Sequence, residues 1–271
     1  MLPPVLLPML LLIDHYDSFV QTLARYCREL GVETRTVRFD RVGPDDLAAA
    51  TALLLSPGPC GPAEAAATVT IVRQTDRPML GVCLGHQIIV AAFGGRVVAG
   101  PHPTHGRASL VRHDGSDLFT GVPDRFPVAR YHSLHAVRLP DDLTVTAELI
   151  DDSIALPETT TPKTTDPQTT ARETADPETA APVRVMAVAH RSRPVYGVQF
   201  HPESVLTPDG RRVLFNFLKL AGFDGLVPPS DWGVEAARRG RPSSPPFDGS
   251  QRPAWFAAGE IGDDDPAYRL P

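Results

Sequence analysis

The stretch PMLGVCLGHQ, residues 78–87, decides how this chain can fold. It opens with a short apolar run, which is typical of a buried strand, and residues 84–93 then follow a helical pattern that a pair of glycines ends. Cys83 therefore lies at a strand-to-helix junction, with a glycine close by on either side. A sharp turn of this kind is a nucleophile elbow, which lifts the side chain clear of the sheet.

Cys83 is best interpreted as a nucleophile, although a lone cysteine is more often a buried structural residue. Cys27, on the face of a predicted helix, fits the structural interpretation. Cys83 differs because the N-terminus of the following helix favours an anion, and therefore a thiolate. The neighbouring glycines also let other backbone segments pass close to the sulfur.

Outward from this junction, the first half of the chain alternates short apolar runs with helical patterns. A helix that Asp17 or Ser18 caps, with Leu23 and Leu30 on one face, is predicted after the first strand. The alternation predicts an α/β fold with an open, mostly parallel sheet and helices on both faces. The predicted strands are residues 10–13, 32–39, 53–55, 78–82 and 96–99.

The second half of the chain is less regular. Residues 183–189 and 195–200 predict a hairpin. Thr207 is the predicted cap of a last helix that Pro208 opens. Together these elements predict one domain over residues 9–223.

Two segments have compositions that disfavour folding. Residues 157–182 are mostly Thr, Pro, Ala, Asp and Glu and have almost nothing to bury, which predicts a disordered insertion within the domain. Residues 224–271 are rich in proline, glycine and charge, and predict a disordered tail.

The composition of the 271 residues narrows the functional classes. The formal net charge is -6 with both signs mixed along the chain, which gives no electrostatic basis for a nucleic-acid binder. The three cysteines indicate a reducing cytoplasm rather than a disulfide framework. The apolar residues 1–13 are too short to span a bilayer and lack a basic leading region, so no membrane contact is predicted, and Met9 is hypothesised to be the true start.

A nucleophilic thiol needs a base, and His201 is the strongest candidate among the nine histidines. It follows the apolar run 195–200, and Glu203 comes just beyond it around a proline. That spacing at a strand end can place the imidazole and the carboxylate within hydrogen-bonding distance, so that the carboxylate orients the ring and stabilises the imidazolium. We therefore predict a catalytic triad of Cys83, His201 and Glu203.

The loop SPGPC, residues 56–60, ends another predicted strand. Because strand ends cluster at one edge of a parallel sheet, this loop is expected to face the elbow. The backbone N–H of Gly58 can form half of an oxyanion hole, and the N–H of Leu84, which follows the nucleophile, can form the other half.

Three further histidines, His102, His105 and His113, lie close together in the sequence and raise the question of a metal site. Their spacing lacks a clear set of cysteine or carboxylate partners, so no metal site is predicted. There is also no glycine-rich loop that would bind phosphate.

Taken together, these motifs resemble those of the class I, or triad, glutamine amidotransferases. The resemblance covers residues 9–223 apart from the insertion. It is greatest for the glutaminase subunits that serve chorismate-using synthases, namely anthranilate synthase component II and the glutaminase of aminodeoxychorismate synthase. The motifs in family order are DHYDSF (14–19), SPGPC (56–60), GVCLGHQ (81–87), HG (105–106), RYHSL (130–134) and QFHPES (199–204).

The resemblance implies a flavodoxin-like fold and a role for each site residue. Cys83 would attack the glutamine amide, and His201, oriented by Glu203, would transfer protons. Gly58 and Leu84 would stabilise the oxyanion through their N–H groups. The residues that the resemblance implies in glutamine binding are Gly58, Pro59, Cys60, Gln87, Ser133 and Leu134.

The resemblance also implies a partner, the chorismate-binding synthase subunit called component I, which receives the ammonia. No cofactor is implied for this subunit, whereas Mg²⁺ is implied for the partner. Cys60 favours aminodeoxychorismate, on the route to 4-aminobenzoate and folate, because many anthranilate-type members carry glycine there. His15 stands where asparagine is usual, and Arg107 where lysine is usual, which leaves the identity of the partner open.

Three alternatives stay open. One is an anthranilate synthase component II of the tryptophan pathway. A second is a subunit that feeds guanylate or carbamoyl phosphate synthesis, which RYHSL (130–134) argues against. The third belongs to another class, a non-catalytic docking subunit, which the intact triad opposes.

Overall fold

The computed structural model describes residues 8–151 and 185–229. The predicted insertion at 157–182 lies outside the described residues, as do residues 1–7 and the tail from residue 230 onward. The start of the predicted tail is described, and it packs on the domain through Leu226 and through a hydrogen bond from the Val227 N–H to Leu30 O at 3.0 Å.

The described residues form a sheet of nine strands. The strands are β1 Met9–Asp14, β2 Glu33–Arg38, β3 Ala52–Leu55, β4 Met79–Val82, β5 Arg96–His113, β6 Arg125–Arg138, β7 Leu143–Asp151, β8 Val185–His190 and β9 Val195–Val198. Their order across the sheet is β2-β1-β3-β4-β9-β8-β7-β5-β6. The pairs from β2 to β9 are parallel, whereas those from β9 to β6 are antiparallel.

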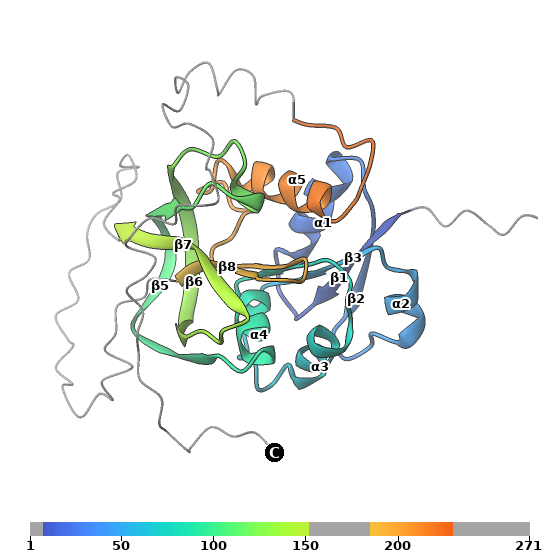
Figure 1. Cartoon of the computed structure of the whole chain (residues 1–271), viewed down its shortest axis with the longest axis horizontal. Coiled ribbons are helices and arrows are strands. Elements are labelled where there is room, and N and C mark those ends of the chain that lie inside the picture. Colours follow the sequence, from blue (N-terminus) through green and yellow to red (C-terminus); the bar gives the residue numbers. More distant parts are fainter. Residues whose placement is uncertain (1–7, 152–184, 230–271) are drawn as a thin grey trace, which may run out of the picture.

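Helices cover both faces of the parallel half of the sheet (Figure 1). The helical segments are α1 Val20–Glu29, α2 Pro44–Ala49, α3 Ala66–Gln74, α4 Leu84–Ala92, the 3₁₀ turn η1 Asp117–Phe119 and α5 Gly210–Leu220. Helices α1 and α5 pack on one face, and α3 and α4 pack on the other. The predicted α/β class, with an open sheet between layers of helices, is therefore confirmed.

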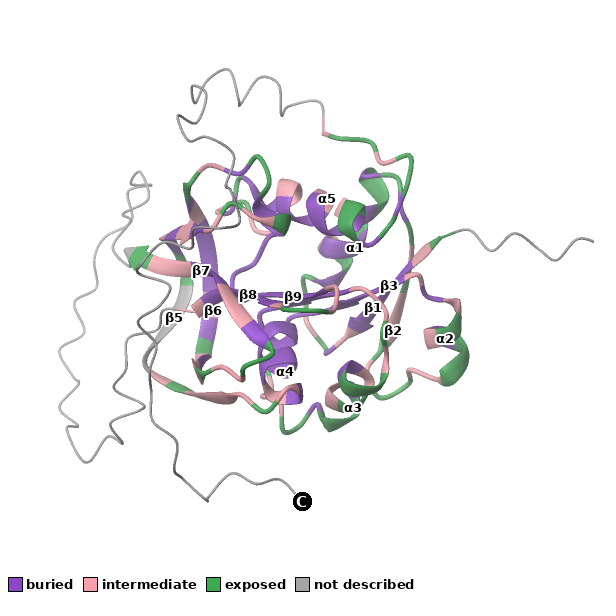
Figure 2. Cartoon of the chain, in the orientation of Figure 1, coloured by how far each residue is buried: buried purple, intermediate pink, exposed green. Residues whose placement is uncertain are grey.

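The side chains of β1 alternate between the two faces of the sheet. Leu10 and Leu12 enter the cluster beneath α1 and α5, whereas Leu11 and Ile13 enter the cluster beneath α3 and α4. All four are fully buried, as expected for a parallel strand that is covered on both sides. Figure 2 shows the result, with buried strands at the centre and exposed residues on the outer surfaces of the helices.

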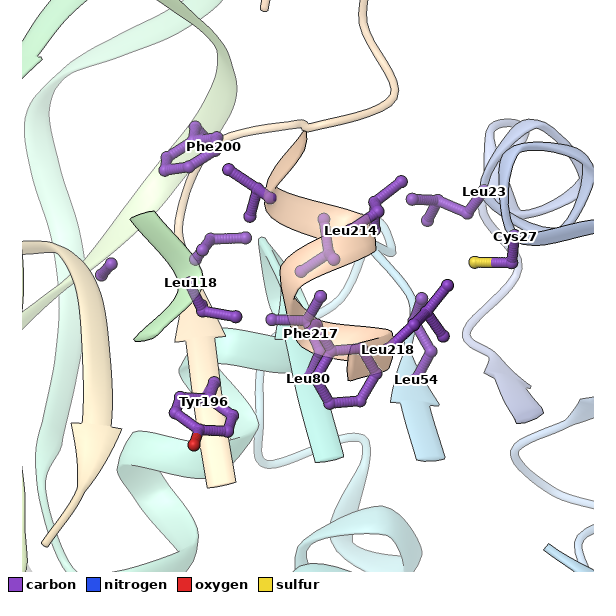
Figure 3. Packing of buried hydrophobic residues seen from close by; sticks show 14 of the residues in the cluster. Leu23, Cys27, Leu54, Leu80, Leu118, Tyr196, Phe200, Leu214, Phe217 and Leu218 are labelled. Carbon is purple, nitrogen blue, oxygen red and sulfur yellow. The ribbon is translucent and has the colours of Figure 1, made fainter. Parts of the chain in front are cut away.

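Helix α5 is held to the sheet by an apolar face that carries Leu214, Phe217 and Leu218 (Figure 3). These side chains belong to the same buried cluster as Leu80 of β4 and Tyr196 of β9. The helix therefore covers the two parallel strands after which the predicted cysteine and histidine follow.

The helix caps predicted from the sequence were wrong. The N-cap of α5 is Asp209, and the Thr207 hydroxyl instead donates to His201 O at 2.7 Å. The N-cap of α1 is Phe19, whose N–H donates to Asp17 Oδ1 at 2.7 Å. In both cases the polar side chain orders the loop before the helix rather than the first turn of the helix.

Several elements were not predicted from the sequence, and one was predicted too short. Helices α2 and α3 and strands β6 and β7 are the elements that were not predicted. The strand predicted at 96–99 extends to His113 as β5, because β6 pairs with it from Arg96↔Arg138 to Arg112↔Arg125. Its length is thus set by a neighbour distant in sequence rather than by local composition.

The parallel half of the sheet brings four loops to one edge. Strands β1, β3, β4 and β9 run in the same direction, so the segments that follow them share the carboxyl edge of the sheet. These segments are residues 15–19, 56–60, 83–87 and 199–204. In open α/β sheets this edge is where ligands bind.

Removing a buried side chain from α5 should destabilise the whole domain. We expect Leu214→Ala, at a fully buried position, to lower the free energy of unfolding by about 2–5 kcal/mol, because it removes apolar contacts and leaves a cavity. Leu220→Ala on the same helix, where the side chain is 39% exposed, should cost less than about 1 kcal/mol. Urea unfolding measures both, and equal losses would contradict the packing of α5.

Candidate active site

Cys83 occupies a strained turn between β4 and α4. Its backbone has φ +53° and ψ -100°, in the positive-φ region that side chains other than glycine rarely adopt. The Cys83 N–H donates to Val198 O of β9 at 2.8 Å, and Cys83 O accepts from the Gln87 N–H at 3.1 Å. Hydrogen bonds of its own N–H and C=O groups therefore hold Cys83 at the carboxyl edge of the sheet. The residue is only 5% exposed.

Glycine is required at the two positions that flank the cysteine, because other backbone atoms come very close to them. A Cβ on Gly81 would lie 2.3 Å from Gly85 O, and a Cβ on Gly85 would lie 2.4 Å from Leu55 O. Contacts that short do not occur between real atoms, so any larger residue at either position would displace the elbow. The glycine pattern of the sequence is thus explained by the crossing of α4 over β3 and β4.

His201 and Glu203 form a buried pair directly after β9. The Nδ1 atom of His201 lies 2.6 Å from Glu203 Oε1, and each residue is only 3% exposed. The loop that carries them is fixed by the His201 N–H, which donates to Ala129 O at 3.1 Å, and by the Thr207 hydroxyl. The structure therefore places the predicted imidazole and carboxylate in direct contact.

The electrostatic environment of His201 favours the imidazolium. Burial lowers the pKa of His201, but the Cys83 sulfur and the Glu203 carboxylate together raise it to about 10. Because Glu203 engages Nδ1, the second ring nitrogen Nε2 is the one left for proton transfer. Among the described residues Nε2 makes no hydrogen bond, although it is buried.

The predicted oxyanion loop lies against the elbow. A Cβ on Gly58 would lie 2.7 Å from both His15 O and Leu84 Cδ2, so only glycine fits between the loop after β1 and the start of α4. The structure thus brings Gly58 and Leu84 together. Pro59, the next residue of the loop, is exposed, and Cys60 is half-buried.

The remaining predicted glutamine-binding residues come from α4 and β6. The Gln87 side-chain Nε2 donates to Leu134 O at 3.0 Å, which ties the helix to the strand. Ser133 is exposed and Leu134 is half-buried. A Cβ on Gly61, next to Cys60, would lie 3.4 Å from Leu134 Cδ1, so the loop after β3 reaches the same strand.

Sequence reasoning missed two groups that adjoin the site. Burial raises the pKa of Asp17, a second carboxyl that interacts with both His201 and Glu203. His15 is fully buried, with its ring nitrogens 3.2 Å from Ser56 Oγ and 3.0 Å from Thr68 Oγ1. Both residues belong to the motif DHYDSF, but their contacts depend on segments far away in the sequence.

No group of three or more metal-ligating side chains is found within residues 8–151 and 185–229. His113 of the sequence candidates instead contacts Pro123 O through Nε2 at 2.7 Å and accepts from the Gly115 N–H at 3.0 Å. The side chains of His102 and His105 lie outside those described. None of the helices in the described part of the chain is long and apolar enough to cross a membrane.

The fold and the site define an α/β protein with an elbow cysteine and a buried histidine–glutamate pair on the same sheet edge. The model of the glutamine amidotransferase class-I family matches residues 11–162 and 161–221 of this chain. The chain belongs to that family.

Comparison with individual proteins supports the family membership. Anthranilate synthase component 2 of Thermus thermophilus is 42% identical over 213 residues, which cover 77% of this chain and 91% of that protein. Aminodeoxychorismate synthase component 2 of Serratia marcescens is 40% identical over 216 residues, which cover 78% and 99%. The crystal structure of a Thermoplasma acidophilum protein assigned to GMP synthase has the same fold, with a TM-score of 0.63 at 24% identity over 86% of this chain and 98% of that chain.

Three buried histidines should make the fold acid-sensitive. Burial lowers the pKa of His15 to about 4 and of His86 to about 4, and burial with the charge of Arg130 lowers that of His132 to about 3. The unfolded chain takes up these protons near pH 6.5, well before the folded chain does, so the stabilisation is present above pH 6.5 and is lost as the pH falls toward 4.

We expect His15→Asn to reduce this acid-induced loss. Between about pH 7 and about pH 4.5, a pKa difference of this size corresponds to a loss of about 2–3 kcal/mol. Urea unfolding at about pH 7 and about pH 4.5 would measure it, and an identical loss in the variant and the wild type would contradict a neutral, buried His15.

Proposed function

We propose that this chain is a glutaminase subunit that hydrolyses L-glutamine and passes the ammonia to a chorismate-aminating partner. The observation that carries the proposal is the buried His201–Glu203 contact at the same sheet edge as the elbow cysteine. Neither the pair nor the elbow is explained by packing alone, because each places polar or strained groups in the interior at a cost in stability.

In the proposed reaction the Cys83 thiolate attacks the carboxamide carbon of glutamine. The oxyanion that forms is stabilised by the backbone N–H groups of Gly58 and Leu84. The His201 imidazolium donates its Nε2 proton to the leaving nitrogen, so that ammonia departs and a glutamyl thioester remains. Neutral His201 then removes a proton from water, which attacks the thioester and releases glutamate and the thiolate. Glu203 fixes the ring orientation and stabilises its charge throughout.

Glutamine is proposed to lie between the loop after β3 and the middle of β6. Pro59, Cys60, Ser133 and Leu134 would contact its amino-acid end through backbone and side-chain atoms. Gln87 uses both of its amide N–H groups inside the protein, so it is Oε1 that it would present to the substrate.

A partner is proposed because free ammonia is mostly protonated in neutral water and then no longer nucleophilic. Apolar side chains are exposed around the site, namely Tyr16 at 50%, Phe19 at 42% and Val205 at 89%. The Phe19 ring lies 6.4 Å from that of His201. Exposed apolar groups gathered at the mouth of a site are typical of a docking surface, which would enclose the path of the ammonia.

The relatives named as component 2 support the existence of a partner component. We propose that this partner is a component I that binds chorismate and needs Mg²⁺. We propose 4-amino-4-deoxychorismate as the product on the strength of Cys60, with anthranilate as the alternative. The two named relatives, at 42% and 40% identity, do not separate these products. Analysis of the product from chorismate and glutamine in the presence of the partner distinguishes them, and anthranilate would overturn the assignment.

The triad is tested by release of glutamate from glutamine. We expect Cys83→Ala to abolish the activity and Glu203→Gln to lower kcat about 100-fold or more, because the ring loses its orienting charge. Cys27→Ala is the matched control, since that thiol is fully buried in the core away from the sheet edge. Equal rates in the wild type and Cys83→Ala would favour a non-catalytic docking subunit.

The docking surface is tested at its most exposed apolar residue. We expect Val205→Asp to weaken binding of the partner at least about 10-fold, because a charge would be buried in the interface. Glutamine-dependent synthesis should fall, while synthesis from added ammonia should persist. Val227→Asp, at an apolar position that is 57% exposed next to α1, is the control, and equal effects of the two changes would contradict this surface.

A further inference from the structure

A second polar side chain, Gln199, approaches the sulfur from the end of β9. Its side-chain Nε2 donates to Cys83 Sγ at 3.7 Å, and the residue is fully buried. Its Oε1 accepts from Gln87 Nε2 at 3.2 Å. The sulfur therefore has an amide N–H donor directed at it.

A chain of hydrogen bonds runs from Arg130 to this amide, and its last links, through Gln87, fix which end of the amide faces the sulfur. The guanidinium of Arg130 can only donate, so His132 Nε2 accepts from Arg130 Nε at 3.2 Å. The proton of His132 is then on Nδ1, which donates to Leu134 O at 2.8 Å. Burial and the charge of Arg130 lower the pKa of His132 to about 3, which keeps the ring in this neutral form.

The hydrogen bonds between Leu134 and the sulfur fix the orientation of the two glutamine amides. A carbonyl only accepts, so Gln87 must direct its NH₂ group toward Leu134 O, at 3.0 Å. The same NH₂ group donates to Gln199, which must therefore present its Oε1 to Gln87. The NH₂ group of Gln199 is left to point at Cys83.

We propose that Gln199 is a catalytic residue whose amide N–H stabilises the Cys83 thiolate, and that Gln87 is the positioning residue that orients it. His132 holds the Leu134 carbonyl to which Gln87 donates. A thiolate in a buried site has few water molecules to solvate it, so a fixed donor is worth more there than at the surface. The proposal rests on Cys83 being the nucleophile of the proposed function. No bond is formed or broken by Gln199, which only donates a hydrogen bond before attack and after release.

The proposal predicts a crossover in reactivity that a purely structural role would not give. Without the donor, thiolate forms at higher pH, so alkylation is slower on the acid side. A thiolate without that donor is also more nucleophilic, because reactivity rises with basicity at a Brønsted coefficient of about 0.4–0.5. A tenfold loss of thiolate should thus appear as about threefold slower alkylation at low pH and about threefold faster alkylation at high pH.

The experiment measures alkylation of Cys83 by iodoacetamide as a function of pH in the full chain, read by peptide mass spectrometry. Gln199→Met keeps the length of the side chain and removes the donor. We expect the midpoint of the alkylation profile of this variant to move up by about one pH unit. Gln199→Glu should move it further, because a carboxylate would face the thiolate. Gln74→Met makes the same chemical change at an exposed position of α3 and should leave the profile unchanged.

Gln87→Met provides a second route to the same readout if Gln199→Met does not fold. It leaves Gln199 in place but frees its amide to rotate, so the midpoint should move in the same direction by a smaller amount. The titratable groups around the sulfur and its base are unchanged in all four variants. These groups are His201, Glu203, Asp17, His86 and His132.

Superimposable profiles for the wild type and the Gln199 or Gln87 variants would overturn the role of Gln199. A failure of the proposed function would look different. In that case the wild-type protein would show no preferential labelling of Cys83 over Cys60 and Cys27 at any pH.

Discussion

The candidate active site depends on the crossing of one helix over two strands at a distance that only glycines allow. Gly81 and Gly85 let α4 begin directly at the end of β4, and Cys83 takes up the strained backbone between them. The strain is borne by the parallel pairing of β4 with β3 and β9, which buries both faces of the strand. A stable sheet thus maintains a local conformation that is unfavourable by itself.

The same sheet brings His201, the proposed base, to the edge that carries Cys83, across more than a hundred residues of sequence. Because β9 pairs in parallel with β4, the residues after both strands share one edge, and His201 follows there. The position of the imidazole is then refined by Glu203 and by Thr207, while Gly210 lets α5 start close to Pro202. The order of the strands therefore sets the approximate position of His201, and individual hydrogen bonds then fix its ring.

The sequence was sufficient for those parts of the site that local patterns encode. Cys83 and His201 each follow a short apolar run, and His201 was predicted as the base because it stands at a strand end two residues before Glu203. That the strands before Cys83 and His201 pair in parallel was not predicted. Most of β5 and the whole of β6 and β7 were not predictable from local patterns, because pairing between distant segments determines them. Asp17 and Gln199 were missed for the same reason, since the site residues that each of them contacts or interacts with are remote in sequence.

The most direct test of the account is to look for the covalent intermediate. Rapid acid quenching of the protein during turnover with glutamine, followed by digestion and mass spectrometry, would locate any glutamyl group. The account predicts a glutamyl thioester on the peptide that contains Cys83, and loss of the adduct as hydrolysis completes. Steady release of glutamate with no adduct on that peptide, or with the adduct on Cys60, would contradict it.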